Sequence, residues 1–278
     1  MSTQFAQRGA CERGFAALQV APEDRARALA NLGEWLSAAA FSDYRAQLGW
    51  LIEQRRFEDL LDSFFRVLPF GTGGRRGPVG IGTNRFNPFT LASSVQGHAE
   101  FLRRYESGDA HSVVVVYDVR VFHDLRRVYD PGLPNPVAGV SSRDFARIAA
   151  EVYAAMGVRV FFPERGFLST PELSFAIRRL GATGGLNISA SHNHPDDNGG
   201  KFYNAHGAQH VPPRDEELAE LVDAVREIRR MPFDEARAAG WIEPIPAAQH
   251  KAYVDLNVSQ SLARSRRARV VFTPLNGT

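Results

Sequence analysis

The chain has 278 residues, a hydrophobic fraction of 44%, a charged fraction of 23% and a formal net charge of +2. This is the composition of an ordinary globular protein with one large or two ordinary domains, and so small a charge gives no reason to expect a nucleic-acid partner. The single cysteine, Cys11, excludes an intrachain disulfide and a multi-cysteine zinc site. No apolar run approaches the roughly 20 residues of a membrane span. Residues 1–20 lack the apolar core of a signal peptide, so we expect a cytoplasmic protein with no membrane partner.

The N-terminal part of the chain has helical periodicity. Apolar residues at Leu29, Leu32, Trp35 and Leu36 share one helix face, and acidic residues lie in the first turn after Pro22. Two more helices are predicted, over 44–54 and 57–67. We therefore expect residues 1–67 to form a helical N-terminal extension packed on the main domain, without chemistry of its own.

A stretch rich in glycine and proline, residues 69–88, is followed by alternating helices and strands. The predicted order is a helix capped by Thr90 and ending near residue 105, a strand over 112–117, a helix over 141–156 that Ser141 opens, and then strand 158–162, helix 169–180 and strand 186–189. Such alternation predicts a parallel sheet with helices on both faces. We assign residues 68–246 to this α/β domain.

The last part of the chain is expected to begin a further domain. The pattern predicts a charged helix over 215–230, a linker at 244–246, a helix over 247–264 and a strand over 268–273. A domain cannot be completed in the residues that remain. We therefore expect residues 247–278 to be a linker helix and the first strand of an incomplete second domain, in the front part of a longer protein.

A polar loop after the strand at 186–189 is the strongest candidate for a site. Residues 191–201 read SHNHPDDNGGK, which supplies a hydroxyl, two imidazoles, two carboxylates and an amine. Open α/β sheets place their chemistry where buried strands end. Lys201 is one of only two lysines in a chain whose Lys and Arg residues are otherwise all arginine. This indicates that position 201 requires an amine rather than any positive charge. We expect Asp196 and Asp197 to be solvated turn residues, and His206 and His210 to lie on the surface.

Five motifs, in order along the chain, resemble those of the α-D-phosphohexomutases, the phosphoglucomutase/phosphomannomutase family. The SHNHP…NGGK segment resembles the family's phosphoserine loop, TASHNP…NGxK. The other segments are FGTGGRRG at 70–77, YDVR at 117–120, STPELSFA at 169–176 and VVFTPLNGT at 270–278. Two departures stand out: His194 replaces the usual proline of the loop, and Arg75 replaces an apolar residue. The resemblance implies a three-layer α/β/α domain I with a mixed, mostly parallel sheet, followed by the start of domain II.

The resemblance also implies a mechanism and its residues. Ser191 would carry a phosphoryl group and exchange it with a hexose phosphate, interconverting the sugar 1-phosphate and 6-phosphate. Lys201 would act as general base or acid, and His192 would orient the loop or assist proton transfer. Arg76 would pair with the phosphoryl group; Thr72, Arg75 and Asn193 are further phosphate-binding candidates. One Mg²⁺ would bind the phosphate on Ser191 together with ligands beyond Thr278, where the family's metal, sugar and C-terminal phosphate loops would also lie.

Two alternatives remain open at this stage. The His-x-His spacing of His192 and His194 is also used by zinc hydrolases. The chain could instead be a non-catalytic fragment that binds a sugar phosphate. The sequence does not select among glucose, mannose and pentose phosphates. The long N-terminus and the residues of the glycine-rich segment resemble the phosphoglucomutase/phosphopentomutase branch of the family, and glucose is the expected sugar. The oligomeric state is not indicated.

Overall fold

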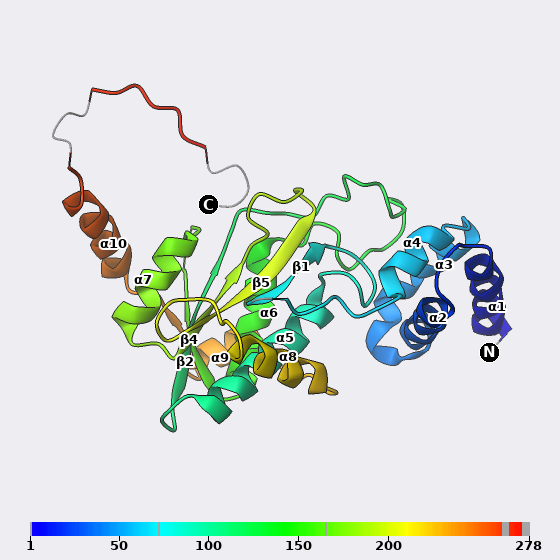
Figure 1. Ribbon diagram of the computed structural model, residues 1–278, viewed down its shortest axis with the longest axis horizontal. Coiled ribbons are helices and arrows are strands. Elements are labelled where there is room, and N and C mark those ends of the chain that lie inside the picture. The colour runs from blue at the N-terminus through cyan, green and yellow to red at the C-terminus, as the bar shows by residue number, and fades with distance from the viewer. Residues whose placement is uncertain (1, 72, 165, 263–266, 274–278) are drawn as a thin grey trace.

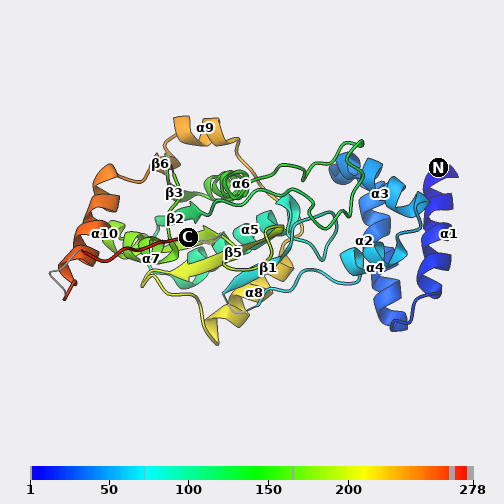
Figure 2. The same cartoon turned by 90° about the horizontal axis from the view of Figure 1, so that it is seen from above.

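The computed structural model describes residues 2–71, 73–164, 166–262 and 267–273. An α/β domain occupies the middle of the molecule (Figure 1). Seen from above, the helices α1–α4 lie at one end of the long axis and α10 at the other, with the strands between them (Figure 2). The predicted fold class, an α/β domain preceded by a helical extension, is confirmed.

The N-terminal extension is built around one tryptophan. Its helices are α1 (Ser2–Ala16), α2 (Pro22–Ser37), the short 3-10 helix η1 (Ala39–Tyr44), α3 (Arg45–Glu53) and α4 (Phe57–Phe64). Trp35 is 1% exposed and stacks on Phe41 with ring centroids 4.2 Å apart. It also meets Phe89 of the main domain edge to face, so an aromatic contact joins the extension to the α/β domain. The periodicity predicted α2, α3 and α4 but not α1.

The sheet has the strand order β1-β5-β4-β2-β3-β6. Strands β4, β2, β3 and β6 run parallel to one another, whereas β5 is antiparallel to both β4 and β1. The bounds of the strands are Gly74–Pro78 for β1, His111–Tyr117 for β2, Val158–Phe162 for β3, Gly184–Ile188 for β4, Asp197–Asn204 for β5 and Ile242–Pro244 for β6. The sheet is therefore mixed and mostly parallel, as the family resemblance implied.

Strand β2 lies in the middle of the sheet, and its valines pack against helices on both faces. Val113 and Val115 belong to the larger core, whereas Val114 and Val116 pack with Leu173 and its neighbours on α7. Because side chains alternate across a strand, a run of apolar residues is what burial on both faces requires. This run predicted the strand correctly.

Helices cover both faces of the sheet. The two long helices α5 and α6 pack on each other, with α8 against α5 and α9 against α6, while α7 lies on the opposite face and contacts α10. Their bounds are Pro88–Tyr105 for α5, Ser142–Ala155 for α6, Thr170–Leu180 for α7, Arg214–Ala224 for α8, Phe233–Ala238 for α9 and Ala247–Ser259 for α10. The described residues include no helix long and apolar enough to cross a membrane.

The structure corrects the predicted start of α5. The N-cap is Asn87, whose side chain accepts hydrogen bonds from Phe89 N and Thr90 N. Thr90, which the sequence suggested as the cap, is the third residue after Asn87, and its Oγ1 accepts a hydrogen bond from Asn87 N at 3.0 Å to complete a capping box. The predicted cap of α6, Ser141, forms a capping box with Asp144.

Two segments predicted as loops contribute strands. β1 lies within the glycine-rich stretch, and β5 contains Gly199, Gly200 and Lys201 of the polar loop. Glycine is depleted in strands, which hid both from the sequence pattern. The close approach of the strands explains why it is used here. A Cβ on Gly74 would lie 2.0 Å from the carbonyl oxygen of Gly200.

The C-terminal predictions are corrected in three places. Helix α8 ends at Ala224 instead of Arg230, because Gln96 on α5 hydrogen-bonds the backbone of Glu227 and Arg229 and holds this segment extended. Pro244, the first residue of the predicted linker, is the last residue of the edge strand β6. Residues 267–273 have no regular secondary structure, so the strand predicted over 268–273 is not formed. Val271 is 98% exposed there, and a strand is stable only when a neighbouring strand pairs with it.

Candidate active site at the end of strand β4

Ser191 lies just beyond β4, where the carboxyl ends of two parallel strands meet. Tyr117 at the end of β2 pairs with Ile188 at the end of β4. The chain then turns, with Asn193 N donating to Ala190 O at 3.0 Å. Ser191 has a positive φ of 54°, a left-handed backbone conformation that non-glycine residues seldom adopt. Its side chain is half-buried, so the hydroxyl is neither enclosed nor fully solvated.

Arg76 and Lys201 lie on the strands next to Ser191. Arg76 in β1 pairs with Gly199 in β5, and the N–H of Ser189 donates to the carbonyl of the same Gly199 at 2.8 Å. Lys201 pairs with Gly74 on one side and with Asn187 on the other. The sheet therefore places Arg76 and Lys201 on β1 and β5, the strands next to the end of β4 that Ser191 follows.

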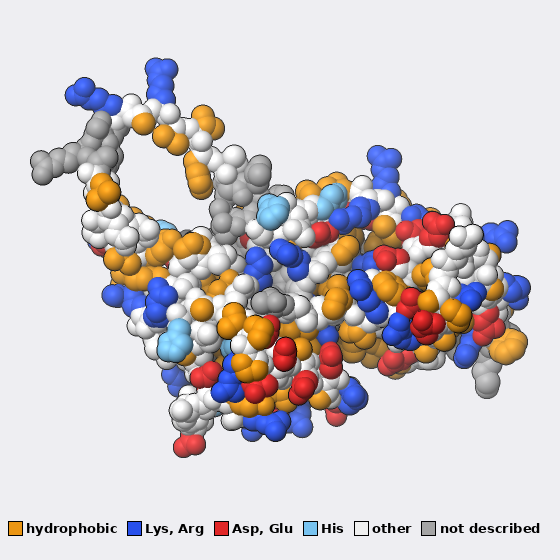
Figure 3. Space-filling model, viewed as in Figure 1, with side chains coloured by type: hydrophobic (Ala, Val, Ile, Leu, Met, Phe, Trp, Pro, Cys, Tyr) orange, Lys and Arg blue, Asp and Glu red, His pale blue; other side chains and the backbone are white. Residues whose placement is uncertain are grey.

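A groove of about 590 Å³ opens beside these strands. Arg76 and Lys201 line it together with Thr170, Tyr203 and Gln209, and its lining contains no carboxylate among the described residues. The guanidinium of Arg76 is exposed and makes no hydrogen bond or ion pair with any residue that the structure describes. Basic side chains lie in the middle of this face, over β1 and β5, with histidine side chains above them (Figure 3). Such a groove favours an anionic ligand.

The amine of Lys201 has a perturbed acidity. Partial burial lowers the pKa of Lys201 below its ordinary value, and the positive charge of Arg76 lowers it further. Asp118 acts in the opposite direction, but its effect is smaller than that of Arg76. A lowered pKa raises the fraction of neutral amine near pH 7, which is what proton transfer by a lysine needs.

His192 and Asn193 flank the serine in different ways. The Nδ1 atom of His192 lies 3.4 Å from Ser191 Oγ, and the imidazole is exposed. The side-chain amide of Asn193 donates to Asp197 Oδ2 at 3.3 Å, so it braces the loop. His194 Nδ1 accepts a hydrogen bond from Asp196 N. The two imidazoles thus differ, since only that of His192 lies at the serine hydroxyl.

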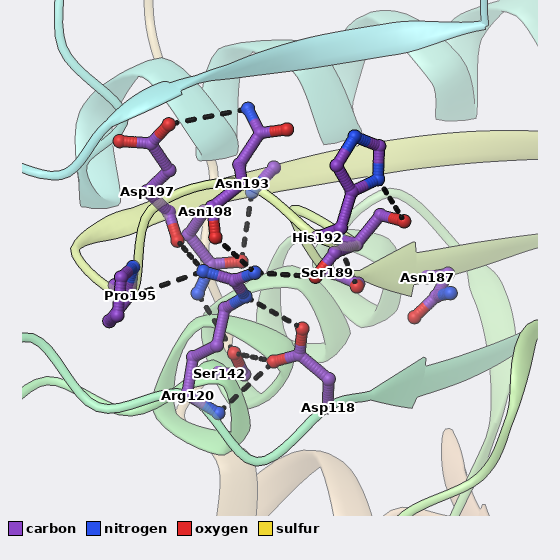
Figure 4. A network of polar contacts seen from close by, with 12 residues as sticks. Asp118, Arg120, Ser142, Asn187, Ser189, His192, Asn193, Pro195, Asp197 and Asn198 are labelled. Atoms are coloured by element: carbon purple, nitrogen blue, oxygen red, sulfur yellow. Dashed lines mark hydrogen bonds and ion pairs between the residues drawn. The ribbon is translucent and has the colours of Figure 1, made fainter. Parts of the chain in front are cut away.

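Arg120, which the sequence analysis cited only as part of a motif, organises the loop. Its guanidinium is buried between the end of β2 and the serine loop (Figure 4). The NH1 and NH2 groups donate to the main-chain carbonyls of Ser191 at 2.6 Å, Asn193 at 3.1 Å, His194 at 2.6 Å and Asp197 at 3.0 Å. The YDVR segment directly after a buried strand was the signal for this residue, since an arginine there must find buried acceptors.

Two aspartates of the loop are buried, contrary to the prediction that they are solvated. Asp196 is 1% exposed because its carboxylate accepts hydrogen bonds from the backbone N–H groups of His123 and Leu125. Asp197 is 9% exposed and pairs with Arg126 at 2.7 Å. Both carboxylates tie the serine loop to the segment after β2.

The predicted surface histidines behave differently from each other. His206 is exposed, as expected, but His210 is 3% exposed and wrongly assigned to the surface. Its ring packs against His98 and Phe101 beneath the sheet, with centroids 5.7 and 4.9 Å away. These contacts come from α5 and could not be read from the local sequence.

Arg75 differs from Arg76 in where its charge lies. It is 3% exposed, donates to Ser93 Oγ at 3.0 Å and contacts Asp223 at 3.3 Å. Burial lowers the pKa of Arg75 to about 10. Because neighbouring residues of a strand point to opposite faces, Arg75 turns its guanidinium toward α5 and α8 rather than the groove. Thr72, the other predicted phosphate-binding residue of this segment, lies outside the described residues.

The described residues do not make a metal site by themselves. They contain no group of three or more histidine, cysteine, aspartate or glutamate side chains placed to hold a metal ion. Asp118, Asp196 and Asp197 are already engaged with Arg120, backbone N–H groups and Arg126, respectively. The pairing of His192 and His194 in a zinc site is therefore not favoured.

The comparisons with known proteins agree with this geometry. Residues 139–229 match the family model described as phosphoglucomutase/phosphomannomutase, alpha/beta/alpha domain I. A phosphoglucomutase of Staphylococcus aureus (strain bovine RF122 / ET3-1) is 32% identical over 238 residues, which are 84% of this chain and 38% of the relative. A phosphoglucomutase of the MRSA252 strain is 32% identical over 230 residues, 82% of this chain and 36% of the relative.

Among solved structures, a protein of Thermus thermophilus described as a putative phosphomannomutase superposes with a TM-score of 0.51 and 27% identity. The match covers 71% of this chain and 37% of that one. The chain thus spans less than two fifths of the length of the relatives it matches. On the combined evidence of the family model, the relatives and the fold, the chain belongs to the α-D-phosphohexomutase family of phosphoglucomutases and phosphomannomutases.

Proposed function

We propose that this chain carries the phosphoserine part of a phosphohexomutase site, in which Ser191 holds a phosphoryl group and exchanges it with a hexose phosphate. The observation that carries the proposal is the position of Ser191. Its half-buried hydroxyl lies on a braced turn at the end of β4, and Arg76 and Lys201 project from the strands beside it. Phosphoryl transfer depends on such positioning and on neutralisation of charge.

The first transfer moves phosphate from the protein to the sugar. A sugar hydroxyl oxygen forms a bond to phosphorus while the bond between phosphorus and Ser191 Oγ breaks. The hydroxyl proton passes to the amine of Lys201, which its lowered pKa makes available as a base. The serine oxygen takes up a proton, which His192 Nδ1, 3.4 Å away, is placed to supply.

The second transfer reverses these bonds at the other end of the sugar. The bound bisphosphate reorients within the site, and its original phosphate passes to Ser191 Oγ, which gives up its proton again. Arg76, which is exposed in the groove, would neutralise negative charge on the phosphoryl group during its transfer. The net result is a sugar whose phosphate has moved between positions 1 and 6.

A magnesium ion would supply further charge neutralisation at the transferring phosphoryl group. Near Ser191 the carboxylates of Asp118, Asp196 and Asp197 are already engaged with Arg120, backbone N–H groups and Arg126, so the described residues do not fit a complete metal site. We therefore assign no step to this ion.

We also propose the division of the chain and its sugar. Residues 1–67 form the helical extension, residues 68–246 domain I, and residues 247–278 a linker helix with the start of domain II. The family model, which matches 139–229, lies within the proposed domain I. Glucose is the preferred hexose, because the first relatives are phosphoglucomutases. We propose that the site works in the cytoplasm.

The class of activity is tested by the mass of the purified chain and by peptide mapping. We expect a fraction of molecules to carry one phosphate, located on Ser191 and lost in Ser191→Ala. A chain that never carries phosphate there, even after incubation with a hexose bisphosphate, would exclude the phosphoserine mechanism.

The 278-residue chain by itself should turn over hexose phosphate little or not at all. The regions of the relatives that it does not match make up more than half of their length, and the family's metal and sugar loops would lie there. The full cycle needs them to hold the sugar while it reorients between the two transfers, whereas a single transfer to Ser191 does not include that step. A coupled assay that follows conversion of glucose 1-phosphate to glucose 6-phosphate measures this. Turnover at the rate of a complete phosphoglucomutase would contradict the expectation.

A further inference from the structure

We propose that Arg120 is a positioning residue that holds Ser191 in its left-handed backbone conformation and thereby sets the direction of the serine hydroxyl. The inference rests on the proposed function, because positioning matters only if Ser191 exchanges a phosphoryl group. Its structural half, that Arg120 imposes the shape of the loop, is tested separately below.

All five N–H groups of the Arg120 guanidinium are used inside the protein. The Nε–H donates to Asp118 Oδ2 at 3.1 Å. The remaining four have acceptors among the main-chain carbonyls of the serine loop, those of Ser191, Asn193, His194 and Asp197. The guanidinium therefore has no N–H left for a phosphate or a sugar, which distinguishes it from Arg76.

The base of this arrangement is rigid. Asp118 also accepts a hydrogen bond from Ser142 Oγ at 2.5 Å, at the first turn of α6. Ser142 Oγ in turn accepts from Asn198 Nδ2 at 2.8 Å. The side chains of Asp118 and Arg120 are 1% and 2% exposed. A buried charge pair that is fully hydrogen-bonded has one orientation, so it can fix the loop that is bound to it.

The contacts explain why the loop tolerates a strained serine. A non-glycine residue at positive φ persists only where the surroundings over-determine it. Here the carbonyl of Ser191 itself is held at 2.6 Å by the NH2 group of Arg120, while the N–H of Ser191 donates to Ser189 Oγ at 3.0 Å. Both sides of the residue are therefore held, and a relaxed backbone at Ser191 would break at least one of these bonds.

Holding the carbonyls inward also directs two amides outward. In a trans peptide the N–H points opposite to the C=O. The carbonyls of Ser191 and Asn193 face Arg120, so the N–H groups of His192 and His194 face away from it. Neither N–H donates to another residue within the described part of the chain. They are therefore available to oxygens of a phosphoryl group on Ser191, as in other backbone anion sites.

The test uses Arg120→Lys, which keeps the charge but cannot bridge four carbonyls. Hydrogen exchange of the amides in residues 190–198 should rise by about tenfold or more, while the exchange of β2 and α6 changes little. Phosphorylation of Ser191 by a hexose 1,6-bisphosphate should slow by about 100-fold, the cost of a small misplacement of a reacting group. The loss should appear in the rate constant at saturating bisphosphate rather than in its half-saturating concentration, because Arg120 has no N–H left for the ligand.

Arg126→Lys is the matched control. Arg126 also contacts the loop, through the side chain of Asp197, but it donates to none of the loop carbonyls and is 35% exposed. We expect wild-type exchange and wild-type phosphorylation in this variant. An equal loss in both variants would mean that any contact with the loop suffices, and the inference about Arg120 would be wrong.

A second comparison needs no phosphorylation and no activity. If Arg120 imposes the positive φ, Ser191→Gly should have a higher Tm than Ser191→Ala, because glycine adopts this conformation without strain. In the Arg120→Lys background the loop can relax, so the difference between glycine and alanine should shrink or vanish. The same difference in both backgrounds would overturn the inference.

The results separate the inference from the proposed function. If the wild-type chain accepts no phosphate, the proposed function fails, and the exchange and stability data alone decide whether Arg120 holds the loop. If wild type accepts phosphate and Arg120→Lys does so equally fast, the proposed function stands and the positioning role is refuted.

Discussion

The pKa of Lys201 is set by its neighbours. The chain has only one other lysine, Lys251, on the exposed surface of α10. Lys201 instead lies between β1 and β4, where burial and the charge of Arg76 lower its pKa. The fraction of neutral amine near pH 7 is therefore higher than for a lysine with the ordinary pKa.

This environment predicts the reactivity of Lys201 toward an acylating reagent. Because the pKa is lowered in the folded state, its reaction with acetic anhydride should reach half-maximal rate at a lower pH in the folded chain than in urea. Peptide mass spectrometry resolves the lysines, and Lys251 reports the reagent dose. Arg76→Gln should move the Lys201 midpoint upward, since one of the causes is removed. Equal midpoints in folded and unfolded chains would contradict the assignment.

For single residues, the sequence pointed to the proposed site better than to the side chains that support it. Ser191, Lys201 and Arg76 were proposed from their motifs, and the structure places Arg76 and Lys201 on the two strands beside the end of β4. Arg120 and Asp196 were missed or misassigned, because their partners lie more than 70 positions away in the chain. A polar residue in a turn gives no local sign that it will be buried by a distant segment.

The element that fixes the glycine-rich segment is helix α5, through its cap. Asn87 is fully buried and accepts hydrogen bonds from Phe89 N and Thr90 N. Its side-chain amide also donates to the carbonyls of Gly80 and Gly82, at 3.1 and 2.8 Å. One side chain therefore begins the helix and shapes the loop that leads from β1.

We predict that Asn87→Ala destabilises the chain more than removal of an ordinary cap. An N-cap contributes about 1 kcal/mol, and two buried carbonyls left without a donor add about 1–3 kcal/mol. Ser141→Ala, which removes the exposed cap of α6, should cost only about 1 kcal/mol. Urea unfolding of the two variants measures both. Equal losses would mean that the Asn87 contacts with the glycine-rich segment contribute nothing.

Elements with regular patterns were predicted well, and those dominated by glycine were not. The valine run of β2 and the amphipathic pattern of α6 led to the correct elements. β5 was missed because its glycines are there for close packing: a Cβ on Gly199 would lie 2.9 Å from Arg75 O and 3.1 Å from Ser189 O. Such a requirement exists only once the two neighbouring strands are in place.

A buried pair of imidazoles, His98 and His210, joins α5 to the segment after β5. His98 is fully buried, with its Nδ1 atom 2.7 Å from Tyr153 OH, and its ring lies 5.7 Å from that of His210. Burial lowers the pKa of both histidines, and the neighbouring His210 lowers the pKa of His98 further. Near His210, Asp215 raises the pKa and Arg214 lowers it, both less than burial does.

These shifts predict a loss of stability in acid. The unfolded chain binds protons at its histidines below about pH 6.5, where the folded chain keeps His98 and His210 neutral. The free energy of unfolding should therefore fall as the pH drops below about 6.5, by up to about 1.4 kcal/mol per pH unit for each histidine. The full stability from this pair is present above that pH. Urea titrations between pH 7.5 and 5 measure the slope.

The double variant His98→Leu/Tyr153→Phe isolates this contribution, because it removes the imidazole and its hydroxyl partner together and leaves no unpaired hydroxyl. Its stability should depend less steeply on pH below about 6.5 than that of wild type. An unchanged slope would show that other groups cause the loss in acid.

The central claim is that Ser191 receives a phosphoryl group, and its most direct test is transfer from a labelled hexose 1,6-bisphosphate. We expect label on the peptide that contains Ser191, no label in Ser191→Ala, and wild-type labelling in the exposed control Ser107→Ala. Label at another residue, or none on the wild-type chain, would contradict the account.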